Sequence, residues 1–206
     1  GDVTIFGGSF TIATGDDGMH ADDTLSISSG TIDITRSYEG LEGAKVLISG
    51  GKISIVASDD GINAAGGSDQ SGFGGELYIS GPTSNGDGTI DCDGSATITG
   101  GIVVAAGSTG MAENFGTAST QGSILVNLSG SAGQAITLKD SDGNILASFT
   151  PAKAFGCVVV SAPGVAQGGT YTIAAGGAST TVTMESLIYG SGMGGFGGMG
   201  GPGNRG

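Results

Sequence analysis

Acidic residues recur at one position in three consecutive segments near the start of the chain. Asp17, Glu39 and Asp60 are separated by 22 and then 21 residues. In a fold whose repeats stack at the strand spacing of roughly 4.8 Å, equivalent residues lie over one another. Two carboxylates at that distance repel by about 1 kcal/mol in water, and by about 3–4 kcal/mol at an effective dielectric constant near 20. The spacing therefore predicts a column of like charges that needs a neutralising cation.

Calcium is the cation that best suits such a column, because Ca²⁺ takes about six to eight oxygen ligands in irregular geometry. The predicted ligands are Asp16, Asp17, Glu39, Glu42, Asp59, Asp60 and Asn63, and the second choice is Asp22, Asp23, Asp91 and Asp93. His20 would share a row with Glu42 and Asn63, but it is a poor Ca²⁺ ligand, so we expect it to be exposed or hydrogen-bonded. The alternative is that these are solvated turn residues, since Asp and Asn suit turns.

The segments that carry these acids are three copies of one pattern. They read GGSFTIATGDDGMHA, SGTIDITRSYEGLEGA and SGGKISIVASDDGINAA, and they share a glycine, an alternating strand, an acidic turn and a small-residue strand. A repeat of 21–22 residues with period-2 alternation and no helical periodicity is typical of a parallel β-helix. We therefore predict an all-β solenoid with one coil per repeat, three short strands per coil, and glycines at the sharp turns.

The alternation also predicts which side chains stack inside the solenoid. One interior column would contain Val3/Ile5, Leu25/Ile27, Val46/Ile48, Leu77/Ile79 and Ile98. A second would contain Met19, Leu41 and Ile62, and Thr89 to Cys92 would repeat the pattern of Thr31 to Ile34.

Composition limits the classes of partner. The formal net charge of −13 argues against nucleic acid and in favour of cations. No apolar stretch approaches 18 residues, so no membrane span is expected. Cys92 and Cys157 have no spacing typical of a zinc site, and a disulfide and two buried thiols both stay open.

The pattern changes along the chain and suggests four parts. Residues 1–110 are predicted to form the coils, interrupted by loops at 66–75 and 81–88, and residues 111–122 a linker or cover. Residues 123–189 contain short strands and an Asp142-Gly143 hairpin signal, which predict an antiparallel cap module on the solenoid. Residues 190–206 form a glycine-rich tail, which could be ordered only by backbone contacts or a close groove.

Several long motifs resemble a known family. GDDGMHAD, SYEGLEG, SDDGINAAGGSDQSG and GPTSNGDGTIDCDGSATITGG, followed by SILVNLS, SFTPAKAFGCVVVSAPG and GGTYTI, look like the carbohydrate-binding domain-containing family of clostridial β-helix proteins, over nearly the whole chain. Those folds are similar to family 9 polysaccharide lyases. The resemblance implies a right-handed parallel β-helix, bound calcium, an extracellular or cell-surface location, and polysaccharide binding without a need for catalysis.

A calcium-dependent lyase acting on uronic acid polymers is the alternative to a binding protein. Such an enzyme needs a cation to acidify the proton beside the carboxylate and a Lys or Arg base to remove it. Arg36, Lys45 and Lys52 are the candidates for that base, although ordinary surface ion pairing is the favoured reading of all three.

For carbohydrate contacts we select Arg36, Tyr38, Lys52 and Tyr78. The chain has no Trp, and Tyr38, Tyr78 and Phe73 are the aromatic residues expected to be exposed. An acidic, pectate-like polysaccharide bridged through Ca²⁺ suits the charge better than aromatic stacking does.

Self-association is a further expectation. The strand pattern already holds at Val3 and Ile5, so the first coil would present unpaired strand edges that favour addition of another chain. A head-to-tail contact that does not close into a ring makes a filament.

Overall fold

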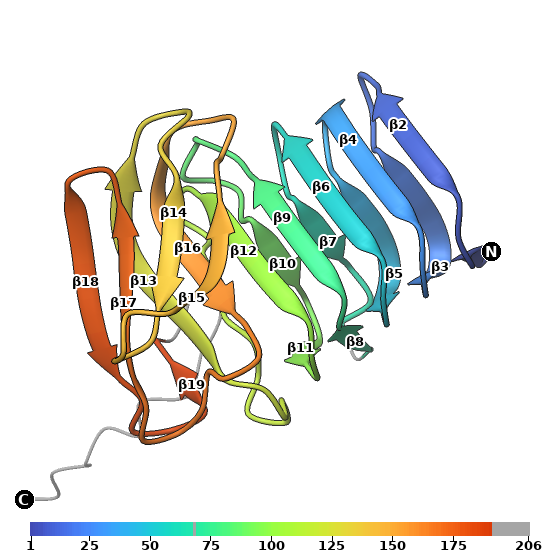
Figure 1. Ribbon diagram of the computed structural model, residues 1–206. Coiled ribbons are helices and arrows are strands. Elements are labelled where there is room, and N and C mark those ends of the chain that lie inside the picture. Colours follow the sequence, from blue (N-terminus) through green and yellow to red (C-terminus); the bar gives the residue numbers. More distant parts are fainter. Residues whose placement is uncertain (68, 191–206) are drawn as a thin grey trace, which may run out of the picture.

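The structure is a computed structural model that describes residues 1–67 and 69–190. In those residues all regular structure is β-strand, and no helix is long and apolar enough to cross a membrane. Figure 1 shows a solenoid that begins at the N-terminus and runs into a cap formed by the later strands. The predicted ordering of the glycine-rich tail concerns residues that, apart from residue 190, lie outside the described ones.

The strands form two solenoid sheets and one further sheet. Sheet A contains β1 (Val3–Ile5), β3 (Met19–Ile27), β5 (Leu41–Ile48), β7 (Ile62–Ala64), β8 (Gln70–Phe73), β10 (Ile90–Cys92) and β11 (Ser95–Ile98). Sheet B contains β2 (Ser9–Ala13), β4 (Thr31–Ser37), β6 (Lys52–Ala57), β9 (Glu76–Ser80), β12 (Ile102–Gly107), β13 (Ser123–Gly130), β16 (Phe155–Ser161) and β19 (Ile188–Tyr189). Sheet C contains β14 (Ile136–Lys139), β15 (Ile145–Phe149), β17 (Thr170–Ala175) and β18 (Ala178–Thr183).

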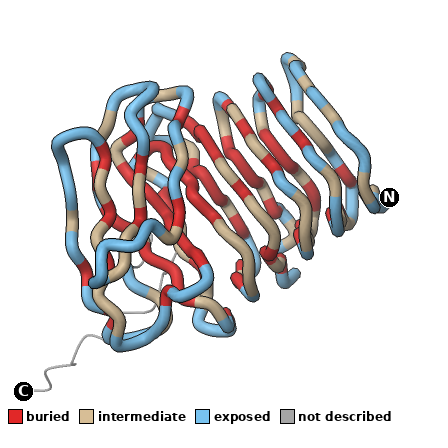
Figure 2. The backbone as a smooth tube through the Cα atoms, viewed as in Figure 1, coloured by how far each residue is buried: buried red, intermediate tan, exposed pale blue. Residues whose placement is uncertain are grey.

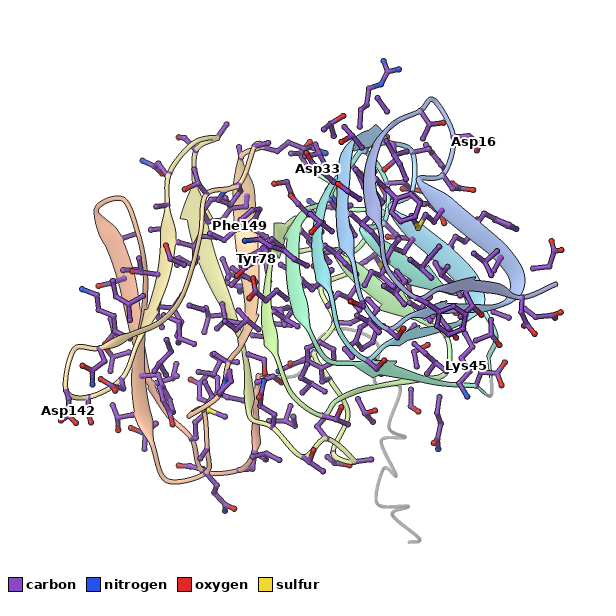
Figure 3. All side chains as sticks on the ribbon, turned by 45° about the vertical axis from the view of Figure 1, so that its right-hand side comes forward. Asp16, Asp33, Lys45, Tyr78, Asp142 and Phe149 are labelled. Atoms are coloured by element: carbon purple, nitrogen blue, oxygen red, sulfur yellow. The ribbon has the colours of Figure 1, made fainter. Side chains whose placement is uncertain are left out.

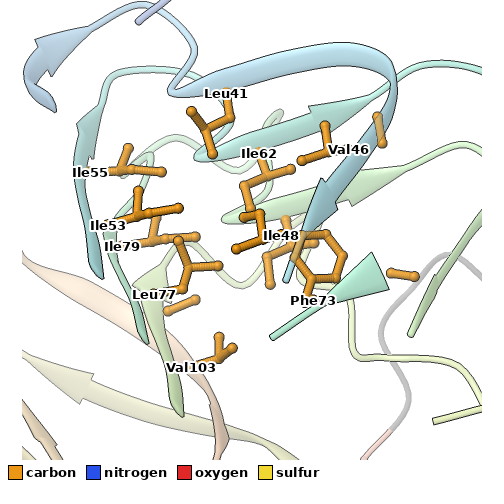
Figure 4. Packing of buried hydrophobic residues seen from close by; sticks show 14 of the residues in the cluster. Leu41, Val46, Ile48, Ile53, Ile55, Ile62, Phe73, Leu77, Ile79 and Val103 are labelled. Carbon is orange, nitrogen blue, oxygen red and sulfur yellow. The ribbon is translucent and has the colours of Figure 1, made fainter. Parts of the chain in front are cut away.

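Parallel pairing of successive repeats confirms the predicted β-solenoid. The described strands make five coils: β1–β2, β3–β4, β5–β6, β7–β9 and β10–β12. Each coil has one side in sheet A and one in sheet B, and the apolar side chains of both sheets meet in a single core (Figure 4). Figure 2 shows buried positions recurring along successive coils. Because every coil is paired to the next in both sheets, equivalent residues are stacked.

The turn from sheet A to sheet B depends on one glycine per coil. Gly8, Gly30 and Gly51 have φ of +103°, +109° and +91°, and Gly75 and Gly101 continue the series at +87° and +78°. Side chains rarely adopt this backbone region, so glycine is required where the coil reverses. The sequence prediction of glycine at the sharp turns is therefore confirmed.

The second interior column is as predicted and is longer than expected. Met19 pairs with Leu41, Leu41 with Ile62, and Ile62 with Ile90. The last pairing corrects one prediction: Thr89 to Cys92 continues this column in sheet A and does not repeat Thr31 to Ile34.

The first interior column is predicted correctly in its first three coils and wrongly in the fourth. Leu77 and Ile79 pair with Ile53 and Ile55 and belong to sheet B. Their expected place is taken by Phe73, which stacks between Ile48 and Ile98. Gly, Ser and Asp around Phe73 give this segment a loop-like composition, which conceals the strand β8.

The prediction that Phe73 is exposed is wrong. Its side chain is buried, with 1% exposure, and packs on Phe115 with ring centroids 5.4 Å apart.

The number of strands per coil also differs from the prediction, because two of the three strands expected per coil are joined in the early coils. β3 runs continuously from Met19 to Ile27, with an irregularity between Ala21 and Thr24 that bends it.

The cap continues sheet B before it adds sheet C. β16 pairs antiparallel with β12, and β13 pairs antiparallel with β16. Val104 and Val158 point away from the solenoid interior into a second core shared with sheet C, whereas Val103 and Val159 point inward. Burial on both faces explains the uninterrupted apolar runs of β12 and β16. The domain boundaries at residues 110, 122 and 189 stay a prediction from the sequence.

Two further segments join the cap to the coils. Residues 111–122 cross the last coil, where the Gly116 and Thr120 amides donate to the carbonyls of Ala96 and Ile98. In the loop before β16, Lys153 Nζ donates to the Ala57 carbonyl at 2.5 Å, and burial lowers the pKa of this ammonium.

Both cysteines are free thiols. Cys92 and Cys157 are buried, and burial raises their thiol pKa values to about 12 and about 11. The open choice between a disulfide and two buried thiols is thereby decided in favour of the thiols.

Replacing Phe73 tests the corrected column. Phe73→Ala removes a fully buried ring, so we expect the free energy of unfolding to fall by about 3–5 kcal/mol in denaturant titrations. Phe6→Ala is the control, because Phe6 is 80% exposed, and it should change stability by less than about 0.5 kcal/mol. Equal effects of the two substitutions would show that Phe73 is not in the core.

Candidate functional site

The turns from sheet B back to sheet A carry the acidic residues. Gly18 donates its amide to the Glu39 carbonyl, and Gly40 donates to the Asp60 carbonyl. These bonds place Asp17, Glu39 and Asp60 in one row across three coils. A second row lies on the sheet B side of the first and is made of Asp16, Tyr38, Asp59 and Asp87. A third row lies on the sheet A side of the first and is made of His20, Glu42, Asn63 and Asp91. We call these three rows the acidic ridge; Asp16 marks its position in Figure 3.

A column of glycines next to the first row lets the turns approach closely. A Cβ on Gly18 would lie 2.6 Å from the Gly40 carbonyl oxygen, and a Cβ on Gly61 would lie 2.5 Å from that of Thr89. A Cβ on Gly40 would overlap the Gly61 carbonyl oxygen. Only glycine therefore permits the backbone spacing that holds the carboxylates over one another.

The ridge contains two groups of side chains with donor atoms all within 4.8 Å of one another: Glu39 with Asp59 and Asp60, and Asp17 with His20 and Glu42. The first group offers only oxygen, which is the donor that Ca²⁺ and Mg²⁺ prefer. The second includes an imidazole nitrogen, which suits a hard cation less well. The donor chemistry of the first group therefore fits calcium better.

Hydrogen bonds hold the first group in place. Asn63 Nδ2 donates to both carboxylate oxygens of Glu39, at 3.2 and 3.1 Å, and Asp60 Oδ1 accepts from the Gly88 amide at 2.7 Å. Asp60 is 8% exposed, so few water molecules can solvate its charge.

The pKa values of this group reflect burial among like charges. Burial, together with the charges of Glu42 and Asp17, raises the pKa of Glu39 to about 7, although the Asn63 hydrogen bonds act in the opposite direction. Burial likewise raises the pKa of Asp60 to about 7, with Asp91 and Asp59 adding to the effect and the Gly88 amide opposing it. The pKa of Asp59 is also raised, by burial and then by Asp87. The ionised group is thus unfavourable without a cation.

The second group places a histidine among its carboxylates. His20 Nδ1 contacts Glu42 Oε2 in a short hydrogen bond and lies 3.6 Å from Asp17 Oδ2. The bond to Glu42 raises the pKa of His20, as expected for an imidazole among carboxylates. His20 is half-exposed and hydrogen-bonded, in agreement with the sequence prediction.

The second-choice ligands divide between the ridge and open solvent. Asp91 extends the third row beside Asn63, whereas the side chains of Asp22 and Asp23 are 81% and 73% exposed. Two further carboxylates lie at the ridge or the last coil and do not follow from the sequence repeat. Asp87 stacks on Asp59 although 28 positions separate them, because extra residues in the fourth coil hide the repeat. Glu113 reaches the last coil, where its Oε2 accepts from the Cys92 amide at 3.2 Å.

The four residues predicted to contact carbohydrate fall into two places. Tyr38 is exposed in the second row of the ridge, and a hydrogen bond to Asp59 raises its phenol pKa. Arg36 is exposed at the end of β4, near Tyr38. Lys52 and Tyr78 lie together on the outer face of sheet B, with Lys52 Nζ 5.7 Å from the centroid of the Tyr78 ring.

The candidate bases for a lyase do not gather at the ridge. Lys52 begins β6, whereas Asp59 follows the end of that strand, and Lys52 Nζ lies 3.6 Å from Glu76 Oε2. Figure 3 places Lys45 on the far side of the solenoid from Asp16. Of the three candidates, only Arg36 lies beside the ridge.

The first part of the chain is similar to a known family. Residues 1–88 match the model of a family described as carbohydrate-binding domain-containing protein. This stretch covers the first four coils, and it is shorter than the resemblance seen in the sequence motifs. No curated protein and no solved structure matches the chain. The resemblance to a carbohydrate-binding domain family is confirmed over these residues, and the similarity to polysaccharide lyases stays a prediction.

Substitution of Gly40 tests whether close stacking maintains the ridge. Gly40→Ala inserts a methyl group against the neighbouring turn, so we expect a loss of about 1–3 kcal/mol in unfolding free energy. Gly15→Ala is the matched control in an equivalent turn, because a Cβ there has no atom within 4 Å. Denaturant titration of both variants provides the comparison; a Gly40→Ala protein as stable as the control would contradict the stacking.

The raised carboxyl pKa values predict the pH dependence of the metal-free protein. Glu39 and Asp60 titrate near pH 7 when folded and near pH 4 when unfolded, so the folded state binds more protons between these values. Stability in EDTA should therefore fall as pH rises from about 4 to about 8. Thermal melts across this range measure the slope.

Asp60→Asn keeps an oxygen acceptor for Gly88 but removes one titrating group, so it should reduce that slope. The control, Asp33→Asn, alters an exposed carboxylate on β4 and should leave the slope unchanged. Stability that rises with pH over this interval would contradict the pKa directions.

Proposed function

We propose, from the match of residues 1–88 to a carbohydrate-binding domain family, that this protein is a non-catalytic polysaccharide-binding solenoid whose acidic ridge holds calcium. The ligand favoured for the ridge is an acidic, pectate-like polysaccharide. The observation that carries the proposal is the Glu39, Asp59 and Asp60 group, in which three carboxylates on two successive turns lie within reach of one ion.

Calcium would relieve the repulsion that the ridge builds up. The two carboxyls of this group with pKa values near 7 are only partly ionised at neutral pH in the metal-free protein. A bound divalent cation favours their charged forms and supplies a positive centre between stacked turns. Asp17, Glu42 and Asn63 flank the group and would complete its coordination or orient its oxygens.

An acidic polysaccharide is favoured because calcium can share its coordination between protein and ligand carboxylates. The chain has a net charge of −13, so a polyanion approaching without cations would be repelled. Arg36 and Tyr38 stand exposed at the edge of the ridge, where they can contact a polymer laid along it.

A non-catalytic role is supported by the positions of the cationic side chains. Abstraction of a proton requires a base within hydrogen-bond reach of the substrate carbon beside the metal. Lys52 and Lys45 lie away from the ridge, and Arg36 belongs to a residue type that stays protonated in proteins. The extracellular location and the head-to-tail self-association stay predictions from the sequence.

Calcium addition tests the proposal directly. Calcium at about a hundred times its dissociation constant should stabilise the protein by about 2.7 kcal/mol, which raises the melting temperature by about 5–10 °C for a chain of this size. The protein should also be retained by polygalacturonate in calcium and released by EDTA. The double variant Glu39→Gln, Asp60→Asn should lose both responses.

Asp142→Asn, which changes an exposed turn of the cap, is the control and should retain both responses. A melting temperature that is the same in calcium and in EDTA would rule out the calcium site. Formation of unsaturated product from polygalacturonate would contradict the non-catalytic role.

A further inference from the structure

A second candidate site lies where the cap meets the outer face of sheet B. Ser54, Tyr78 and Val104 are neighbours in one row of outward side chains across β6, β9 and β12. Val104 is buried beneath the cap, whereas Tyr78 is only partly buried and packs against the edge of the same core, as Phe149 does. Phe149, at the end of β15, packs beside Tyr78 with ring centroids 5.5 Å apart (Figure 3). The two rings form a step between the solenoid and the cap.

Polar groups surround this aromatic step. Lys52 Nζ lies 5.7 Å from the centroid of the Tyr78 ring and 3.6 Å from Glu76 Oε2. The Tyr78 hydroxyl donates to the same Glu76 oxygen at 3.4 Å. Lys52 and Glu76 have side chains that are 62% and 46% exposed, so both can exchange partners with a ligand. The step thus combines aromatic surface with a cation and a carboxylate.

This combination matches the chemistry of a pyranose ring. A sugar ring presents C–H groups that pack against an aromatic face, and hydroxyls that both donate and accept hydrogen bonds. Glu76 can accept from a hydroxyl, and Lys52 can donate to one. Binding sites of this kind use apolar surface for area and a few polar groups for orientation.

The charge of the step distinguishes it from the ridge. The charges of Lys52 and Glu76 cancel, so the step offers no net electrostatic attraction to a uronate. The net negative charge of the whole chain repels a uronate. A neutral sugar meets no such opposition. Asp33 and Ser54 precede Tyr78 along the same face, and their short side chains leave room for further sugar units.

We infer that the step formed by Lys52, Glu76, Tyr78 and Phe149 binds a neutral pyranose unit of a polysaccharide without calcium. The inference rests on the proposed carbohydrate-binding function, but it is independent of the acidic ridge and its cation. It makes the cap part of the binding surface, since Phe149 lies outside the residues that match the family.

Affinity electrophoresis in EDTA tests the inference. The protein is run through gels that contain hydroxyethyl cellulose, glucomannan or mixed-linkage β-glucan, which are neutral pyranose polymers. At least one polymer should retard the wild-type chain. Tyr78→Ala and Phe149→Ala should each weaken that retardation about tenfold, which corresponds to the loss of an aromatic contact. Ile145→Ala is the matched control, because Ile145 is a 61% exposed apolar residue on the same strand as Phe149.

The aromatic variants could loosen the cap, so a second variant acts only on exposed groups. Lys52→Ala combined with Glu76→Ala leaves both rings in place and should also weaken retardation. No retardation by any of the three polymers would overturn the inference, as would retardation that all of these variants leave unchanged.

A parallel gel with polygalacturonate and calcium separates this site from the ridge. Retention on polygalacturonate alone would overturn the neutral-sugar site and leave the ridge proposal standing. Retention on a neutral polymer in EDTA, with no calcium-dependent retention, would support the step and count against the ridge.

Discussion

Register between coils is the constraint on which the structure depends. Each coil is hydrogen-bonded to the next through both sheets, so a residue type placed at one position is stacked on its equivalent in the following coil. For Leu41 and Ile62 this stacking is favourable, because each buries apolar surface against the next. For Glu39 and Asp60 it is unfavourable, because carboxylates are brought together. The apolar interior thus holds in place an arrangement of charges that would otherwise separate.

The ridge and the step show two ways in which this scaffold presents polar chemistry. At the turns, glycines allow the backbones to approach, and the carboxylates become buried enough to change their protonation. On the flat outer face of sheet B, side chains are spaced by the strands and remain exposed. The Lys52 and Glu76 pair is therefore an ordinary surface interaction, whereas Asp60 is held in a nearly solvent-free position.

The regular part of the repeat can be predicted from the sequence. The 21–22-residue spacing is enough to predict the solenoid, the Met19, Leu41 and Ile62 column, and the residues that share a row. Where insertions break the spacing, the predicted positions are wrong. Asp87 lies 28 positions after its equivalent Asp59 instead of 21 or 22. The glycine-rich surroundings of Phe73 conceal a buried strand, so that Leu77 and Ile79 are predicted in the wrong sheet.

Contacts that depend on the cap lie beyond such reasoning. Phe149 follows Tyr78 by 71 positions in the chain, and no periodicity connects them, since their contact arises from how sheet C packs on β12 and β13. Glu113 reaches the last coil for a similar reason, because its segment is irregular and is positioned by Phe115 and by backbone bonds to that coil.

The reversal of strand direction at β16 limits how such a protein can change its length. An antiparallel strand cannot act as the template for another coil of the same hand, so duplication of a repeat unit is accommodated only upstream of the cap. Each added unit would lengthen the acidic ridge and the outer face by the same increment. The number of contacts that the protein can make with a linear polymer would therefore increase by one repeat at a time. A single duplication would extend the acidic ridge and the outer face of sheet B together.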